Sequence, residues 1–243
     1  MAKSKGAKKH PKTPHDVVAI RRELAKFLRQ KDDDDHVIGG ATCGVYVFYD
    51  YDGEPIYVGK TYEKLRGRIS RHLTNRRTDA VAMNVLDPFE VADVEIYPFF
   101  DLEKRPGESA ETWKGRVKPV LARVEWTVYK KVRDASRFKA VLNEKVVPET
   151  KTIKLPLSYK GRIIPSDMFE LRSHPDIRIA RRATTIAALA RIISERVVQL
   201  GLRQTLDTQA KRLQYLVGQR LGNFSEAEMA EEATEEDTGE NVE

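Results

Sequence analysis

Apolar residues follow two different periods along the chain, and each period predicts its own kind of element. The segment Cys43–Gly59 holds two runs of β-branched and aromatic residues on either side of Asp52-Gly53, a strong signal for a hairpin turn. Pro55 stands at the start of the second run, where a missing backbone donor is tolerated. A third strand is expected at Val94–Phe100.

Helical spacing of apolar residues predicts helices before and after these strands. One covers residues 14–30, and a second begins at Thr61, which can cap it, and ends near Leu73. Pro119 suits the first turn of a third helix, which continues to about Arg133. The apolar stripe of this third helix consists of Leu121, Val124, Val128 and Val132.

The C-terminal part is expected to be a hairpin of two amphipathic helices. The first ends at Gly201, a natural helix stop, and the second carries apolar residues from Leu206 to Leu221. The stripe of the first consists of Ile179, Ala183, Ile186, Ala190, Ile193, Val197 and Leu200.

Four segments fit no regular element well. Residues 101–116 are read as an irregular insertion, Val141–Val146 as a short extended piece, and residues 148–178 receive no assignment. The run Asp32–Asp35, followed by His36, resembles a metal site in composition. Because consecutive side chains do not converge on one point, a solvated linker is expected there.

Composition narrows the class of protein. Hydrophobic residues make up 40% of the chain, enough for a packed core, and charged residues 33%. Cys43 is the single cysteine, which excludes an intrachain disulfide framework and a zinc site built from cysteines. No apolar run approaches the roughly 20 residues of a membrane span, and the N-terminus lacks the apolar segment of a secretory signal. We therefore expect a soluble, cytoplasmic protein that has no membrane partner.

The net charge of +6 conceals a strong asymmetry. Residues 225–243 hold nine acidic residues and no basic one, so the rest of the chain carries +15. Five lysines precede the first acidic residue, Asp16: Lys3, Lys5, Lys8, Lys9 and Lys12. A basic body suggests a polyanionic partner, because each neutralised phosphate releases counterions. The alternative is that surplus lysine only aids solubility.

These patterns divide the chain into five parts. Residues 1–13 are a basic arm and residues 225–243 an acidic tail, both expected to be disordered, since blocks of like charge repel and bury little surface. A helix and linker cover residues 14–36. The strands and the central helices lie within residues 41–147, and a mostly helical, basic extension covers residues 148–224.

Several residues with functional side chains are brought together by the expected hairpin and the helix after it. Tyr46 and Tyr57 lie one on each strand, so both hydroxyls can face one side of the sheet. Arg68 and His72 are four apart on the following helix and share a face, with Lys60 at the start of that helix. Taken singly, such tyrosines usually pack in a core, and a basic helix face is usually solvated.

Glu125 is unusual for its position on the third predicted helix. It points only about 40° away from Leu121, given 3.6 residues per turn. A carboxylate at the edge of an apolar stripe is costly unless it is paired or binds a metal. A salt bridge to a nearby arginine or lysine explains Glu125 equally simply when it is taken alone.

Three segments together resemble the GIY-YIG nuclease superfamily: Gly44-Val-Tyr46, then after ten residues Tyr57-Val-Gly59, then Arg68-Ile-Ser-Arg-His72. Valine replaces isoleucine in both name motifs. The resemblance extends to Glu125 and to Asn143 in Leu142-Asn143-Glu144, and it covers residues 41–147. It implies an α+β fold with a small antiparallel three-stranded sheet flanked by helices, to which the helical C-terminal extension is added.

The resemblance also implies a chemistry, the metal-dependent hydrolysis of DNA phosphodiesters. Glu125 would hold a single divalent cation, Mg²⁺ or Mn²⁺, because one carboxylate completed by water and phosphate suits an ion that keeps its hydration. Arg68 would pair with phosphate oxygens. Tyr46 would help to activate water; its ordinary pKa near 10 is too high for an efficient base, so nearby cations such as Lys60 must assist.

The remaining site residues receive supporting roles from the same resemblance. Tyr57 would orient the attacking water or the phosphate, His72 would support the site, and Asn143 would fix local geometry. The expected products carry 5′-phosphate and 3′-hydroxyl ends.

Target choice would belong to the flanking regions. The extension could contact DNA or mediate a homodimer through its apolar stripes; alternatively, its helices pack on the nuclease domain and its arginines are merely solvated. These arginines are Arg172, Arg178, Arg181, Arg182, Arg191, Arg196, Arg203, Arg212 and Arg220.

Two alternatives to an endonuclease remain open. One is a non-catalytic nucleic-acid-binding protein that retains the fold, and the other is a structural basic protein with a chance match. Among endonucleases, a restriction or phage-defence enzyme competes with a repair or recombination enzyme.

Overall fold

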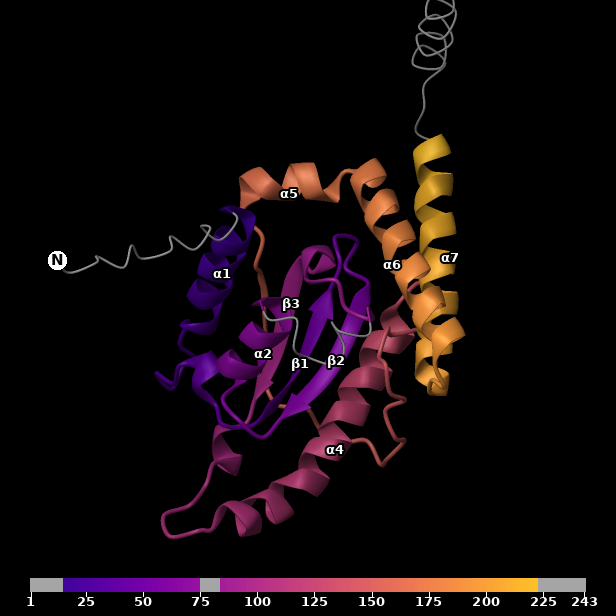
Figure 1. The fold of residues 1–243 in the computed structure, drawn as a ribbon. Helices are drawn as coiled ribbons and strands as arrows, with labels where there is room; N and C mark the ends of the chain where they lie inside the picture. Colours follow the sequence, from indigo (N-terminus) through magenta and orange to yellow (C-terminus); the bar gives the residue numbers. More distant parts are fainter. Residues whose placement is uncertain (1–14, 75–83, 223–243) are drawn as a thin grey trace, which may run out of the picture.

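The computed structural model describes residues 15–74 and 84–222 (Figure 1). The predicted basic arm and acidic tail therefore lie outside the described residues. Within them, no helix is both long and apolar enough to cross a membrane. The α-helices are α1 (His15–Leu28), α2 (Leu65–Thr74), α4 (Ala110–Ala135), α5 (Ser166–Ser173), α6 (Pro175–Glu195) and α7 (Leu200–Gly222). The strands are β1 (Gly44–Tyr49), β2 (Pro55–Thr61), β3 (Asp93–Pro98) and β4 (Tyr159–Arg162), and three short 3₁₀ helices are η1 (Ile38–Gly40), η2 (Pro88–Glu90) and η3 (Phe100–Leu102).

The sheet is antiparallel with the strand order β2-β1-β3-β4. The predicted hairpin is confirmed: β1 and β2 meet at a turn in which Gly53 has a φ of 76°, a conformation that glycine adopts without strain. The prediction of three strands is wrong, because β4 adds a fourth. This strand has only four residues and alternates half-buried with exposed positions. At its centre, Gly161 leaves room for the Phe27 ring, which lies 2.4 Å from where a Cβ would be.

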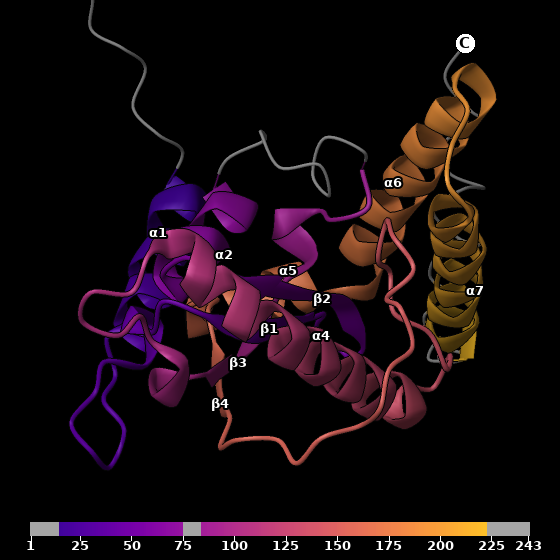
Figure 2. The same cartoon turned by 90° about the horizontal axis from the view of Figure 1, so that it is seen from below.

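Helices cover both faces of the sheet (Figures 1 and 2). On one face, α1 and α2 pack with sheet residues such as Phe48 and Ile96. On the other, α4 packs against Val45, Val47 and Val58. Because strand side chains alternate between the faces, each strand of the hairpin contributes to both cores.

Helix α4 is longer than its sequence suggested. It begins at Ala110, where the Ser109 hydroxyl accepts a hydrogen bond from the Thr112 backbone N–H at 3.0 Å. The interpretation of residues 101–116 as wholly irregular is therefore wrong, and Pro119 lies inside the helix. The buried stripe continues backward from the predicted one through Val117 and Trp113, and this packing outweighs the helix-breaking tendency of proline.

Helix α2 begins later than predicted. Thr61 is the last residue of β2, and its hydroxyl accepts a hydrogen bond from the Glu63 N–H at 3.2 Å in the turn that follows. The helix starts at Leu65, which is fully buried. Thr61 thus ends β2 and stabilises the turn after it, and it is not the cap of α2.

The two C-terminal helices lie side by side at one side of the molecule (Figure 1), as predicted, but they bury a different face. Val197 and Leu200 of the predicted stripe are exposed, and Ala183 and Ala190 are exposed as well. The buried face of α6 consists of Arg178, Arg182, Thr185 and Leu189. The prediction that Gly201 ends the first helix is wrong, since α6 ends at Glu195 and Gly201 lies in the first turn of α7.

Most arginines of the extension are bound within the protein itself. Seven of the nine arginines named above pair with carboxylates of the chain: Arg172 with Asp16, Arg178 with Asp52, Arg181 with Asp87, Arg182 with Asp50, Arg191 with Glu195, Arg212 with Asp50 and Arg220 with Asp176. The interpretation that all of them are solvated is wrong for Arg178, Arg182 and Arg212, which are buried.

Three of these arginines join the extension to the hairpin of β1 and β2. Arg178 donates two hydrogen bonds of 2.7 Å to the Asp52 carboxylate in the hairpin turn. Arg182 contacts the buried Asp50 carboxylate at 3.3 Å, and Arg212 donates to the Pro55 carbonyl at 3.1 Å. The helices α6 and α7 are therefore part of the same folded unit as the sheet.

Candidate active site

Two tyrosines of the hairpin lie next to each other on the α2 face of the sheet. In the strand register Tyr46 is opposite Gly59 and Tyr57 is opposite Phe48, so the tyrosines are diagonal neighbours with ring centroids 6.2 Å apart. Both belong to the core that α1 and α2 cover. They face the same side, as the hairpin predicted.

Gly59 makes room for Tyr46. A Cβ at Gly59 would lie 2.6 Å from the Tyr46 hydroxyl and 2.7 Å from the Tyr57 ring. A side chain at this position would therefore displace one ring or both.

We expect Gly59→Ala to lower the free energy of unfolding by about 1–3 kcal/mol, the usual cost of overpacking a tight core. Chemical denaturation measures this difference. Gly218→Ala is a matched control, because a Cβ at Gly218 meets nothing within 4 Å. A Gly59→Ala protein as stable as the control would contradict the requirement for glycine.

The Tyr46 hydroxyl connects α2 to the sheet. It lies 2.9 Å from Nε2 of His72 and accepts a hydrogen bond from Nε of Arg68 at 3.3 Å. Tyr46 is fully buried, and burial raises its pKa to about 12, although Arg68 acts in the opposite direction. Burial, with Arg68 and Arg71 nearby, lowers the pKa of His72 to about 3, so that its imidazole is neutral at neutral pH.

Glu125 projects from α4 to Lys60 on β2. The Lys60 ammonium donates to a Glu125 carboxylate oxygen at 2.6 Å, and 12% of the Glu125 side chain is exposed. Burial raises the pKa of Glu125, which Lys60 opposes. The sequence-based expectation placed Lys60 beside Tyr46 as its helper; the structure pairs Lys60 with Glu125, and the cation in contact with Tyr46 is Arg68.

Asn143 holds the strand that carries Tyr57. Its side-chain amide donates to the Val58 carbonyl at 2.8 Å, and its oxygen accepts from the Val58 N–H at 3.0 Å. Residues 141–146 form no strand, contrary to the extended piece expected there. The amide of Asn143 instead takes the place of a neighbouring strand beside Val58.

Glu144 is a residue of this neighbourhood to which the sequence pattern assigned no role. Its negative charge acts on Tyr46, Tyr57, Arg68 and Glu125. Its position directly after Asn143 was the one feature of the sequence that could have indicated that it lies near the site.

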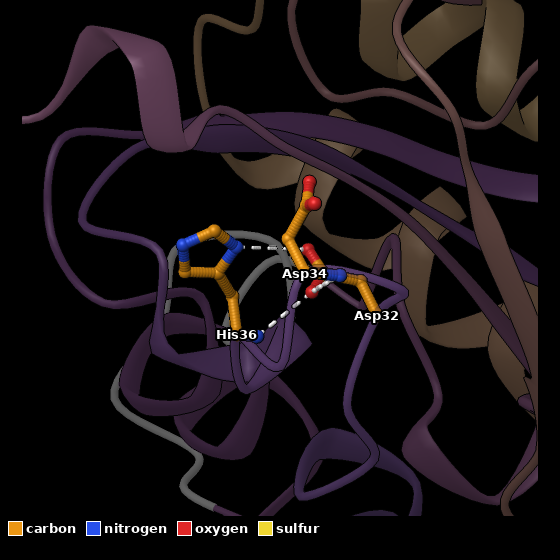
Figure 3. A group of neighbouring side chains, drawn as sticks. All are labelled: Asp32, Asp34 and His36. Atoms are coloured by element: carbon orange, nitrogen blue, oxygen red, sulfur yellow. Dashed lines mark hydrogen bonds and ion pairs between the residues drawn. The ribbon is translucent and has the colours of Figure 1, made fainter.

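A second group of acidic residues lies in the loop after α1 (Figure 3). One possible metal-binding atom from each of Asp32, Asp34 and His36 lies within 4.8 Å of the others, so alternate side chains of this run do converge. Asp33 and Asp35 do not belong to the group, and residues 33–36 are exposed, as expected of a solvated linker. The convergence has a structural cause. The Asp32 carboxylate accepts hydrogen bonds from the backbone N–H groups of Asp34 and His36 and thereby closes a turn. The His36 ring also stacks on Phe100.

Comparisons with known proteins agree with this geometry. Residues 42–119 match the family model of the GIY-YIG catalytic domain. Searches of curated proteins and of solved structures gave no match. The matched segment includes Tyr46, Tyr57 and Arg68, and the fold adds Glu125 and Asn143 from beyond its end. Residues 42–119 of the chain are therefore similar to a GIY-YIG catalytic domain.

Proposed function

We propose that this protein is a metal-dependent DNA endonuclease whose active site consists of Tyr46, Tyr57, Lys60, Arg68, His72, Glu125 and Asn143. The observation that carries the proposal is the Glu125 carboxylate, held at the edge of the core by the Lys60 ammonium of β2. The same hairpin carries Tyr46, the buried tyrosine that accepts a hydrogen bond from Arg68. Such an arrangement suits a phosphodiester, which brings negative charge and requires both a cation and a phosphate-binding arginine.

The donor atoms at this place fit Mg²⁺ or Mn²⁺. Glu125 offers carboxylate oxygens, which hard divalent cations prefer. His72 is buried, and its Nε2 contacts the Tyr46 hydroxyl, so this nitrogen is engaged in the hydrogen bond that orients Tyr46. We propose that Glu125 holds the ion, which when bound stabilises charge on the phosphate and lowers the pKa of a bound water.

Arg68 is proposed to bind the scissile phosphate. Its Nε–H is used by Tyr46, which fixes the plane of the guanidinium. The other four N–H donors, on the terminal nitrogens, form the fork that matches phosphate oxygens. Tyr46 and His72 thus act first by orienting Arg68.

The role proposed for Tyr46 in activating water requires its proton to leave. Its pKa of about 12 keeps the hydroxyl protonated at neutral pH, and the positive charge of Arg68 favours the ionised form. The neutral His72 beside it can accept a hydrogen bond from that hydroxyl. In the reaction a water oxygen forms the new bond to phosphorus, the bond to the 3′ oxygen breaks, and the products carry 5′-phosphate and 3′-hydroxyl ends.

Incubation of the protein with supercoiled plasmid tests the proposal. We expect nicked and linear DNA in the presence of Mg²⁺ or Mn²⁺, none in the presence of a chelator, and ends that DNA ligase can rejoin. Parallel incubations with single-stranded DNA and with RNA determine the substrate class. If binding to DNA is observed without cutting under any of these ions, the protein is a non-catalytic binding protein that retains the fold.

A further inference from the structure

Helix α4 (Figure 2) has two flanks beside the buried stripe that packs on the sheet, and the two flanks differ. The segment that leads to β4 covers one of them. There Arg123 donates hydrogen bonds of 3.3 Å to the carbonyl oxygens of Lys151 and Thr152. The Thr127 hydroxyl accepts a hydrogen bond of 3.1 Å from the Ile153 N–H. A partner of α4 therefore has to lie on the opposite flank.

The opposite flank carries Glu125, whose carboxylate pairs with Lys60 of β2. Two lysines, Lys118 and Lys114, precede Glu125 on the same helix, and both are exposed. At 3.6 residues per turn, each of them lies within about 20° of Glu125 around the helix axis. The candidate metal ligand thus stands at one end of a line of two exposed cations, which we call the lysine flank (Lys114 and Lys118).

The ammonium groups of the lysine flank are available to a ligand. Within residues 15–74 and 84–222, neither Lys114 nor Lys118 takes part in a hydrogen bond or an ion pair. Arg116, by contrast, is bound to the Glu108 carboxylate at 3.0 Å. Glu111 is exposed in the first turn of α4, where a carboxylate interacts favourably with the helix dipole. Between Glu111 and the candidate metal ligand, every charged residue of the helix is basic.

The spacing of these cations fits a polymer of phosphates. With a rise of about 1.5 Å per residue, Lys118 and Lys114 lie about 10 and 16 Å along the helix axis from Glu125. One strand of duplex DNA advances about 3.4 Å per nucleotide, so these lengths correspond to about three and five nucleotides. A strand with its scissile phosphate at Glu125 therefore has further phosphates beside both lysines, which a single nucleotide does not.

We propose that the lysine flank binds the backbone of duplex DNA on one side of the scissile bond. This inference rests on the proposed function and extends it, because it assigns contacts with the DNA outside the catalytic residues. A lysine ammonium is a compact charge, and contacts with phosphates carry no sequence information directly. The flank thus contributes affinity and position along the strand, and not the choice of target sequence.

Equilibrium binding of a fluorescent DNA duplex tests the inference, measured by anisotropy in the presence of a chelator so that the DNA stays intact. We expect Lys114→Gln/Lys118→Gln to weaken binding by about tenfold or more at about 0.1 M salt, and to reduce the slope of log affinity against log salt by about 2, because two phosphate contacts are lost. The matched control is Lys130→Gln/Lys154→Gln, which removes the same charge from exposed positions. Lys130 lies about 140° around α4 from Glu125.

The outcomes separate the two proposals. If the wild-type protein cuts DNA, but the two double variants bind the duplex with equal affinity and equal salt dependence, the inference about the lysine flank is wrong and the proposed function stands. If the wild-type protein neither binds nor cuts DNA, both are wrong. If it binds without cutting, the proposed function fails, and the comparison of the two double variants still decides the inference. Circular dichroism establishes that each variant is folded.

Discussion

Glu125→Gln is expected to reduce the rate of DNA cleavage by a factor of about 10³ or more. A metal ion contributes several kcal/mol of charge stabilisation to such a transition state, and about 4 kcal/mol corresponds to a factor of about 10³. Glutamine keeps the size of the side chain and removes the negative charge that is proposed to hold the cation. The measurement is the initial rate of plasmid nicking at saturating Mg²⁺.

The pH dependence of the wild-type protein provides a second test of the same carboxylate. A cation binds the ionised form, and burial raises the pKa of Glu125 above the ordinary value. As the pH falls, protons therefore displace the cation at a higher pH than they would from an exposed glutamate. Cleavage should decline in this range, and a higher concentration of Mg²⁺ should shift the decline to lower pH.

Glu111→Gln is the matched control for Glu125→Gln, because Glu111 lies on the same helix, α4, and is exposed. Its rate should equal that of the wild type. DNA binding by Glu125→Gln should persist, since Arg68 and the basic surface remain. A Glu125→Gln protein that cuts at the wild-type rate would reject Glu125 as the metal ligand.

Local patterns were sufficient to predict the elements that hold the site. The hairpin depends on Asp52-Gly53 between two strand-forming runs, and the stripe of α4 repeats at helical spacing. Each of these two patterns involves only residues that are close together in the sequence. The hairpin and the helix that follows it are sufficient to bring four candidate site residues together: Tyr46, Tyr57, Arg68 and His72.

Features that depend on distant partners could not be predicted in this way. The strand β4 has a short, polar sequence, and it pairs where Phe27 fills the space above Gly161. Arg178 and Arg182 were read as surface residues because their acidic partners stand about 130 residues earlier in the chain. Charge patterns along one helix do not reveal such partners.

The same limit applied to the electrostatics of the site. Lys60 was expected beside Tyr46 because the two are close in the hairpin, but its partner is Glu125, 65 residues later. The backbone of Glu144 is contacted by Gly201 of α7, and both residues lie outside the matched domain. The proximity of Tyr46, Tyr57, Arg68 and His72 was thus predictable from their spacing, whereas the charge partner of Lys60 required the fold.

Arg212→Met is expected to lower the free energy of unfolding by about 3–5 kcal/mol, the typical cost of breaking one side of a buried ion pair. Arg212 and Asp50 are each 2% exposed. Two hydrogen bonds to the carbonyl oxygens of Pro55 and Ala140, at 3.1 and 3.3 Å, would be lost as well. For a chain of this length, the change corresponds to a fall in Tm of about 6–20 °C, which thermal unfolding measures.

The appropriate control is Arg203→Met, which changes an exposed arginine of the same helix and should leave the Tm nearly unchanged. A double-mutant cycle with Asp50→Asn separates the ion pair from the loss of packing. If Arg212 acts mainly through Asp50, the double variant should be clearly more stable than the sum of the two single effects predicts. Strict additivity would assign the effect of Arg212 to its carbonyl contacts.

The loss of Arg212 should also lower the cleavage rate, because its two carbonyl partners begin or precede segments that carry candidate site residues. Pro55 is the first residue of β2, which carries Tyr57 and Lys60, and Ala140 directly precedes the segment that holds Asn143 and Glu144. At a temperature where Arg212→Met is still folded, its cleavage rate should fall below that of Arg203→Met. Equal rates of the two proteins would show that α7 stabilises the domain without positioning its site.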